Sequence, residues 1–250
     1  MKPAWQQLAL PFAHEPQFVA ADFLAAGSNA EALAWLAPDS GWPQRRLALW
    51  GPEGCGKTHL LHVWAARAGA RLLAGPALPR EPAPPDGPVA VDDADAAAER
   101  PLLHLLNALE EAGLPVLLAA RTPPARWRTA LPDLASRLRA VTAAEIHVPD
   151  DSLLRALLAR LLAERQLAVT ESVQDWLRLR LPRTPAAIRE AAARLDRAAL
   201  IARGRVSQRI AADVLRSMEA AGPVNMRGVA DHEDFAAAPR PASSAMPCLL

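Results

Sequence analysis

The hydrophobic and polar positions divide the chain into stretches of different character. Between residues 21 and 149, short apolar runs alternate with segments of helical periodicity. From 150 to 218 only the helical period is present, whereas 1–20 and 219–250 show little periodicity of either kind. Because buried strands that alternate with helices are typical of α/β folds, the pattern predicts a parallel sheet with helices on both faces, followed by a small all-α domain.

The α/β stretch allows individual strands and helices to be assigned. Strands are expected at Arg46–Trp50, Arg71–Leu73, Val89–Val91, Val116–Ala120 and Glu145–Val148, which makes a five-stranded sheet. A helix is expected to begin after Gly27, with Ser28 or Asn29 as its N-cap. The other helices are expected at Lys57–Ala68, Pro101–Ala112 and Pro132–Leu138.

The all-α stretch and the two ends are assigned in the same way. Asp151 or Ser152 can cap a helix that runs to about Glu164. Further helices are expected at Glu171–Leu181, Pro185–Ala202 and Ser207–Met218. Prolines break any helix within 1–20, which predicts a flexible arm. The Gly/Pro/Ala/Ser-rich composition of 219–250 predicts a disordered tail.

A glycine-rich loop directly follows the first expected strand and leads into a helix. It reads Gly51-Pro52-Glu53-Gly54-Cys55-Gly56-Lys57-Thr58 and matches the pattern G-x-x-x-x-G-K-[ST] in full. Glycines let backbone N–H groups surround a phosphate, and the helix N-terminus adds a favourable dipole. Lys57 is expected to reach the β- and γ-phosphates, and the Thr58 hydroxyl to bind Mg²⁺. The loop predicts a protein that binds ADP or ATP.

Two acids at the end of the third expected strand complete this predicted site. Asp92 can hold the Mg²⁺ through water, and Asp93 can orient an attacking water. Cys55 is interpreted as a small filler of the loop. His59 lies next to the loop and is counted among the nucleotide-binding residues. His59 and His62 lack the further ligands that a metal site of their own would need.

Composition narrows the class of protein. The net charge is +1, so there is no overall electrostatic attraction to nucleic acid. Lysine occurs only at positions 2 and 57, and a compact ammonium in the glycine loop suits a phosphate. The cysteines, Cys55 and Cys248, give no disulfide framework and favour a reducing compartment. No signal peptide and no membrane-spanning stretch are apparent, so a soluble cytoplasmic protein is expected.

Three segments beyond the glycine loop resemble the AAA+ proteins of the DnaA type. The segment 22–29, which includes Phe23, resembles the part of those proteins that wraps the adenine. The segment 131–138, Leu-Pro-Asp-Leu-Ala-Ser-Arg-Leu, resembles the stretch that carries their arginine finger, here Arg137. Ile188-Arg189-Glu190 resembles their sensor 2 motif, whose Arg points at the nucleotide from the helical lid.

A peptide in the N-terminal arm narrows the resemblance further. Gln7-Leu8-Ala9-Leu10-Pro11-Phe12 looks like the Q-L-x-L-P-[LF] peptide with which bacterial proteins bind the sliding clamp of DNA polymerase III. In such peptides the Gln amide is fixed by hydrogen bonds, and the residues at Leu10 and Phe12 fill an apolar pocket. Together with the DnaA-type segments, and without a DNA-binding domain after the lid, the chain resembles the Hda family.

This resemblance implies a negative regulator of replication initiation. A clamp-bound Hda protein that holds ADP contacts ATP-bound DnaA and triggers hydrolysis there, so Arg137 would act on a neighbour's γ-phosphate. DNA would be contacted only through the clamp, and self-association through the AAA+ interface is also implied. An alternative role for Arg137 is to cap its short helix or to form an ion pair with Asp133 one helical turn away. For Arg189 the alternative is a solvated position on an amphipathic helix.

One departure from the family concerns sensor 1, the polar residue that helps to position water at the end of the fourth strand. Here the segment reads Ala119-Ala120-Arg121-Thr122, so only Arg121 or Thr122 is available. We therefore predict tight ADP binding and slow intrinsic hydrolysis. Other functions remain open at this point: a helicase loader or remodelling ATPase of the same superclass, a DNA-binding module using the arginines of the helical domain, and a small-molecule kinase.

Overall fold

The computed structural model describes residues 18, 20, 23–81, 83–202 and 205–220. Its centre is a single sheet in which every pairing is parallel, with the order β2-β3-β4-β1-β5. The strands are β1 (Arg46–Trp50), β2 (Arg71–Ala74), β3 (Val89–Asp92), β4 (Val116–Ala120) and β5 (Thr142–Glu145). The predicted five-stranded parallel sheet is therefore confirmed.

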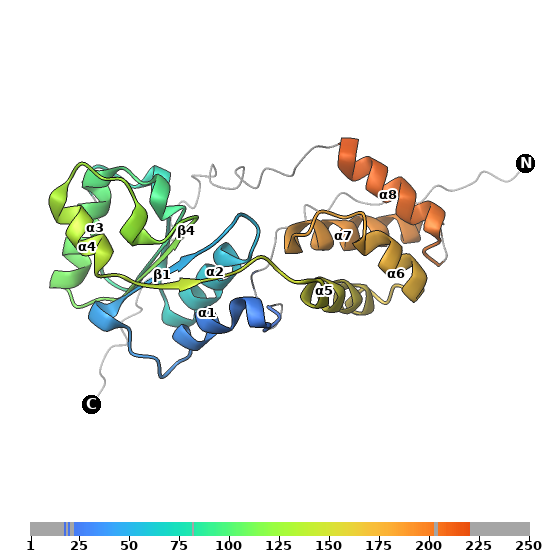
Figure 1. Cartoon of the computed structure of the whole chain (residues 1–250), viewed down its shortest axis with the longest axis horizontal. Coiled ribbons are helices and arrows are strands. Elements are labelled where there is room, and N and C mark those ends of the chain that lie inside the picture. The colour runs from blue at the N-terminus through green and yellow to red at the C-terminus, as the bar shows by residue number, and fades with distance from the viewer. Residues whose placement is uncertain (1–17, 19, 21–22, 82, 203–204, 221–250) are drawn as a thin grey trace, which may run out of the picture.

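Helices cover both faces of the sheet (Figure 1). They are α1 (Ala30–Trp35), α2 (Lys57–Ala68), α3 (Glu99–Glu111) and α4 (Pro132–Arg139). Successive strand residues point to opposite faces. On β1, Leu47 and Leu49 pack in the core with α1 and α2, whereas Ala48 packs in the core with α3 and α4. All three side chains are fully buried, which explains why β1 reads as a continuous apolar run.

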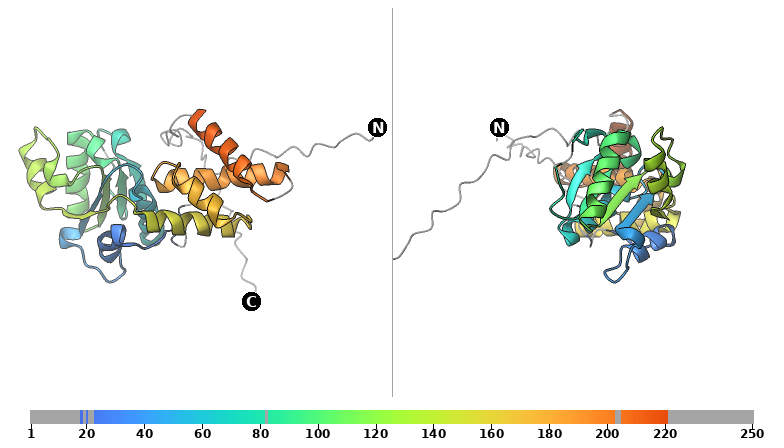
Figure 2. Two further views of the ribbon diagram at one scale, coloured as in Figure 1. Left: turned by 45° about the vertical axis from the view of Figure 1, so that its right-hand side comes forward. Right: turned by 90° about the vertical axis from the view of Figure 1, so that its left-hand side faces the viewer.

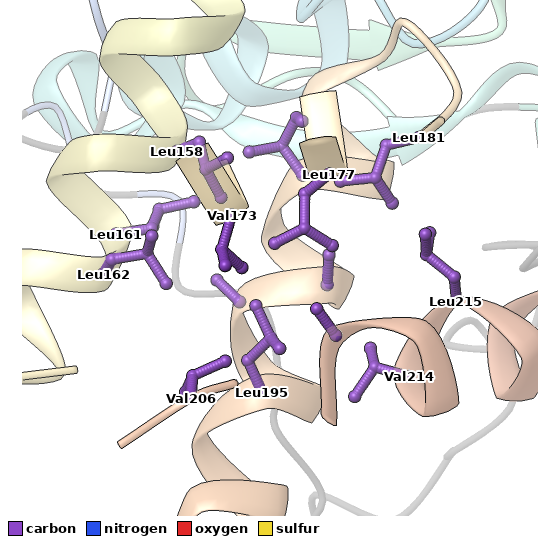
Figure 3. Close-up of a cluster of buried hydrophobic side chains, with 14 of the residues drawn as sticks. Leu158, Leu161, Leu162, Val173, Leu177, Leu181, Leu195, Val206, Val214 and Leu215 are labelled. Carbon is purple, nitrogen blue, oxygen red and sulfur yellow. The ribbon is translucent and has the colours of Figure 1, made fainter. Parts of the chain in front are cut away.

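The second part of the chain folds into helices that lie together at one end of the molecule (Figure 2). They are α5 (Asp151–Glu164), α6 (Glu171–Arg178), α7 (Pro185–Ala202) and α8 (Gln208–Ala220). Leu158, Leu177, Leu195 and Val214 come from the four different helices and share one buried core (Figure 3). Among the residues described between 150 and 220 there is no strand, as the helical periodicity predicted. We call this helical unit the lid.

The fifth strand begins earlier than expected. We predicted Glu145–Val148, whereas β5 is Thr142–Glu145. The two alanines of β5 give only a weak apolar pattern. The larger apolar residues Ile146 and Val148 follow the strand and led us to place it too late in the sequence. Ile146 still donates its backbone N–H to the Trp50 carbonyl at 2.8 Å, but Val148 is 59% exposed. The large apolar residues therefore mark the exit from the sheet rather than the strand itself.

The N-cap of α5 also differs from expectation. Asp150, rather than Asp151 or Ser152, accepts a hydrogen bond from the backbone N–H of Leu153 at 2.7 Å. This bond, with a second from the Ser152 hydroxyl, holds the pKa of Asp150 below its usual value. The cap fixes the point at which the chain leaves the sheet and enters the lid.

Asn29 precedes α1, as one of the two expected caps, but its side chain serves the preceding turn. Its amide oxygen accepts the N–H of Ala26 and its amide nitrogen donates to the carbonyl of Leu24, both at 2.9 Å. The segment that carries Phe23 is thereby fixed close to the sheet. The other element boundaries differ from expectation only by a few residues at their ends.

Candidate nucleotide-binding site

The glycine loop connects β1 to α2 and depends on backbone conformations that favour glycine. Gly54 and Gly56 have φ angles of +77° and +110°. A Cβ on Gly56 would lie 3.1 Å from the ring of Phe23, and a Cβ on Gly54 would lie 3.2 Å from Cγ2 of Thr184. Side chains at these positions would therefore be strained and would crowd the loop from both sides.

Lys57 and Thr58 begin α2 at the inner side of this loop. The Lys57 ammonium donates to the carbonyls of Gly51 at 2.8 Å and Pro52 at 2.7 Å, so it lies over the loop rather than in solvent. The Thr58 hydroxyl donates to a carboxylate oxygen of Asp92 at 2.9 Å. Although β4 lies between β1 and β3 in the sheet, the loop and the acid at the end of β3 meet.

Asp92 is half-buried, and this burial raises the pKa of its carboxyl group. The Thr58 hydroxyl opposes the shift, whereas the neighbouring Asp93 adds to it. A partly desolvated carboxylate next to a hydroxyl is a suitable setting for a hard cation, because both groups offer oxygen ligands. The Thr58–Asp92 pair thus fits the predicted Mg²⁺ site in its chemistry.

Asp93 lies beside this pair in an unusual backbone conformation. Its φ and ψ are 47° and 43°, the left-handed region that few residues other than Gly adopt. Its side chain is exposed, and its N–H donates to the other carboxylate oxygen of Asp92 at 3.0 Å. Gly75, just after β2, packs so closely that a Cβ there would lie 2.3 Å from the Asp93 carbonyl oxygen. The tertiary structure therefore holds Asp93 in its strained conformation.

The lid contacts the glycine loop near Gly54, whereas Phe23 contacts it near Gly56. Thr184, immediately before α7, lies against Gly54 as described, and Nη2 of Arg189 on α7 lies 3.4 Å from Nδ1 of His59 on α2. Phe23 packs on the same histidine, with ring centroids 5.3 Å apart. Three separate parts of the chain thus come together around the loop, as expected for the residues assigned to nucleotide binding.

These residues form a set that fits a nucleotide and Mg²⁺. Lys57 and the backbone of the glycine loop would hold the phosphates, Thr58 and Asp92 would hold the metal ion, and Arg189 would approach from the lid. Cys55 is buried within the loop, and burial raises the pKa of its thiol. A raised pKa favours the protonated thiol, and the filler role stays a prediction. In the described part of the chain, no cluster of three His, Cys, Asp or Glu side chains could hold a metal alone.

Arg121, one of the two residues considered for the sensor 1 role, turns toward the glycine loop. Arg121 follows β4, and its guanidinium lies 3.3 Å from the carboxylate of Glu53. Both side chains are exposed, so the ion pair is weak. The Arg121 N–H donates to Asp95 at 3.0 Å, which fixes the backbone at this point. Sequence reasoning named Arg121 as a candidate but did not foresee its partner on the loop.

Arg137 lies elsewhere. The groups described so far gather where the strands end, which we call the carboxyl edge of the sheet. Arg137 on α4 contacts Glu110 near the end of α3, and Glu110 lies 2.9 Å from Arg46, the first residue of β1. This is the amino edge. The two ends of β1, Arg46 and Trp50, are four residue steps apart, which is about 13 Å at about 3.3 Å per step. The ion pair with Asp133 that we considered is present at 3.5 Å.

Sequence reasoning missed several residues of these two regions. Glu110 looked like an ordinary polar position on an amphipathic helix, and Arg46 like the flank of a strand. Neither carries a local signal, because their contacts join segments far apart in sequence. Thr184 was overlooked for the same reason. Phe18 stacks on His62 with ring centroids 4.3 Å apart, and only its position just before the Phe23 segment could have suggested this.

The proposed clamp-binding peptide, with Gln7, Leu8, Leu10, Pro11 and Phe12, lies outside the described residues, as do the tail and most of the arm. These predictions therefore stay predictions. Within the described ranges, none of the helices has the length and apolar character required to cross a membrane.

The sheet order, the glycine loop on β1 and the helical lid define a DnaA-like AAA+ fold. Among solved structures, domain III of the Thermotoga maritima replication initiation protein DnaA is similar at a TM-score of 0.64 and 18% identity, over 81% of this chain and 97% of that chain. DnaA bound to AMPPCP and single-stranded DNA is similar at a TM-score of 0.57 and 18% identity, over 72% of this chain and 64% of that one.

A further similar structure is the Thermotoga maritima RuvB A156S mutant, at a TM-score of 0.54 and 17% identity, over 69% of this chain and 62% of that one. The chain thus spans less than two thirds of these longer neighbours. No family model and no curated protein matches the sequence. At these identities the likeness establishes the fold, and function has to be argued from the site.

Proposed function

We propose that this protein binds ADP or ATP with Mg²⁺ and acts as a negative regulator of replication initiation of the Hda type. The observation that carries nucleotide binding is the convergence of Lys57, Thr58 and Asp92 with Arg189 of the lid around one glycine loop. One similar structure, DnaA, is bound to AMPPCP, which supports nucleotide binding by a protein of this fold. Intrinsic hydrolysis is proposed to be slow, since only Arg121 or Thr122 is available for the sensor 1 role after β4.

The regulatory part of the proposal rests on where Arg137 lies. A guanidinium held at the amino edge cannot reach a nucleotide at the carboxyl edge of the same chain, about 13 Å away along β1. It can reach a nucleotide that a neighbouring subunit presents to that edge. An arginine supplied in trans stabilises the charge that develops during phosphoryl transfer. The position of Arg137 thus supports the role that the resemblance to Hda implies, which is to stimulate hydrolysis by ATP-bound DnaA.

The proposed partners follow from the same resemblance. The peptide from Gln7 to Phe12 would bind the sliding clamp of DNA polymerase III, so DNA would be contacted only indirectly. Clamp binding would place the protein at replicating DNA, where DnaA is to be inactivated.

The test is a reconstituted assay of ATP hydrolysis by DnaA. ADP-bound protein and DNA-loaded clamp are added together and separately, and released phosphate is measured. We expect strong stimulation only when both are present. Gln7→Ala should weaken clamp binding and reduce the stimulation, with Gln17→Ala, at an arm position outside the peptide, as the control. No stimulation by the wild-type protein with clamp would overturn the regulatory role.

A remodelling ATPase is a second candidate function. Asp92, which accepts the Thr58 hydrogen bond, and the adjacent Asp93 are the acids that ATP hydrolysis would need. One similar RuvB structure is described as a Holliday junction branch migration motor. Such a protein would hydrolyse ATP without clamp or DnaA. Steady-state hydrolysis by the isolated chain therefore distinguishes the two functions: a fast rate favours the motor, and a negligible rate favours the regulator.

A further inference from the structure

Glu110 lies between two arginines that belong to different layers of the fold. Its carboxylate contacts the guanidinium of Arg137 on α4 and lies 2.9 Å from that of Arg46 on β1. The hydrogen bond from Arg137 and the charge of Arg46 together lower the pKa of Glu110, so it is ionised at neutral pH. One carboxylate thus serves two cations.

Arg46 makes this arrangement rigid. Its side chain is only 4% exposed, and it begins the strand that pairs with β4 and β5. A buried guanidinium needs a counter-ion, because desolvation without one is very costly. Arg46 therefore keeps Glu110 at the amino edge of the sheet even though the Glu110 side chain itself is half-exposed.

The consequence for Arg137 is a fixed orientation. Glu110 contacts its Nη1, and Asp133 forms an ion pair with its Nε at 3.5 Å, although this buried Nε makes no hydrogen bond. The guanidinium is therefore restrained along one side by two carboxylates. Its side chain is still 25% exposed, which leaves part of the group accessible to another molecule. Restraint of a long side chain before the partner arrives removes an entropic cost from the reaction.

We propose that Glu110 is a positioning residue: anchored by Arg46, it holds the Arg137 guanidinium ready for the triphosphate of a neighbouring chain. This inference rests on the proposed function of Arg137 and extends it to a residue that makes no contact with the nucleotide of either chain. The adjacent Glu111 is also exposed and provides a matched control on the same helix.

The first experiment measures stimulation of DnaA ATP hydrolysis, with DNA-loaded clamp, as a function of protein concentration. Glu110→Gln should lower the maximal rate at least about tenfold and leave the half-saturating concentration nearly unchanged, because the lost interaction matters mainly in the transition state. Glu110→Asp should recover part of the rate. Glu111→Gln should match the wild type. ADP affinity and melting temperature report whether each variant is folded.

Glu110→Gln leaves Arg46 buried beside a neutral group, and this could unfold the protein. The double variant Arg46→Met with Glu110→Gln removes the orphaned charge, and its maximal rate should also be low. A Glu110→Gln or double variant as active as Glu111→Gln would overturn the inference. Higher activity would overturn it too, because the carboxylate would then restrain Arg137 rather than prepare it.

A second measurement does not depend on DnaA. In NMR spectra the Nη1–H group of Arg137, which contacts Glu110, should exchange slowly with water in the wild type and faster in Glu110→Gln, whereas Arg139 should be unaffected. If this difference is seen but Arg137→Ala leaves DnaA stimulation intact, the proposed finger role fails while the positioning of the guanidinium by Glu110 stands. Equal exchange in both proteins would rule out that positioning.

Discussion

The two edges of the sheet carry the same kinds of side chain in opposite arrangements. At the carboxyl edge, Lys57 is hydrogen-bonded to loop carbonyls, and the nearby Asp92 is bonded to a hydroxyl. At the amino edge, the cations Arg46 and Arg137 are bound to carboxylates. On the proposed function, the first edge binds the nucleotide and Mg²⁺ of this chain, whereas the second presents the Arg137 guanidinium to another chain.

Loss of the proposed arginine finger, Arg137, should have the largest effect. It should change the stimulation of DnaA but not the binding of nucleotide at the carboxyl edge. Arg137→Ala should reduce stimulation of DnaA hydrolysis by about 10³-fold or more, the scale seen for arginines supplied in trans. ADP affinity, measured by calorimetry, should not change, because the site lies at the other edge. Arg139→Ala, on the same helix and exposed, is the control. An equal loss in both variants would mean a general charge effect rather than a finger.

The reciprocal change acts at the carboxyl edge. Lys57→Ala should weaken ADP and ATP binding by roughly 10- to 150-fold, since hydrogen bonds to charged groups contribute about 1.5–3 kcal/mol. The NMR signal of the Arg137 Nη1–H group should stay as in the wild type. Arg67→Ala, near the other end of α2, is the control for folding of that helix. Unchanged nucleotide affinity in Lys57→Ala would refute the phosphate site.

The lid should make a smaller contribution to the same edge. Arg189→Ala should lower ADP affinity by up to about tenfold, or about 1.4 kcal/mol, because the group is only partly buried and is one of several cations and dipoles near the loop. Calorimetry with Arg197→Ala, an exposed arginine on the same helix, provides the comparison. Equal ADP affinities of Arg189→Ala and Arg197→Ala would favour the alternative that Arg189 is a solvated residue on an amphipathic helix.

The smallest effect is expected at the junction of sheet and lid, between the end of β5 and the start of α5. Asp150→Ala should lower the melting temperature at neutral pH by a few degrees through loss of the α5 cap. The folded-state pKa of Asp150 lies below its unfolded value, so its contribution is present above about pH 4 and is lost as pH falls through the folded-state pKa. The difference in melting temperature between the wild type and Asp150→Ala should therefore become smaller in acid.

Asp150→Asn keeps a side chain that can cap the helix but does not titrate. Its melting temperature at neutral pH should lie between those of the wild type and Asp150→Ala. A gap between wild type and Asp150→Ala that stays constant from pH 7 to acid would show that the carboxylate charge plays no part in the cap.

The sequence could predict what depends on local pattern. The strand β1, the glycine loop and α2 were foreseen with their boundaries, because apolar runs and glycines report on backbone conformation directly. The strand β5 was misplaced, since alanines at its centre resemble many other segments. Its position depends on pairing with β1, which is a tertiary property.

The candidate site followed the same rule. Lys57, Thr58 and Asp92 could be named from motifs, and they do lie together. Glu110 could not, since an acidic residue on the outer side of an amphipathic helix is usually just solvated. Its role depends on a buried arginine at the start of a strand, and only the folded chain brings the two together.

The close approach of Gly75 to Asp93 has a consequence for how the protein can vary. A single methyl group at position 75 would push the backbone of Asp93, just after β3, because its carbon would lie only 2.3 Å from the Asp93 carbonyl oxygen. The turn that follows the edge strand β2 therefore constrains the geometry of the acidic pair Asp92 and Asp93. Changes far from any ligand could silence the site through this contact while leaving every phosphate-binding group in place.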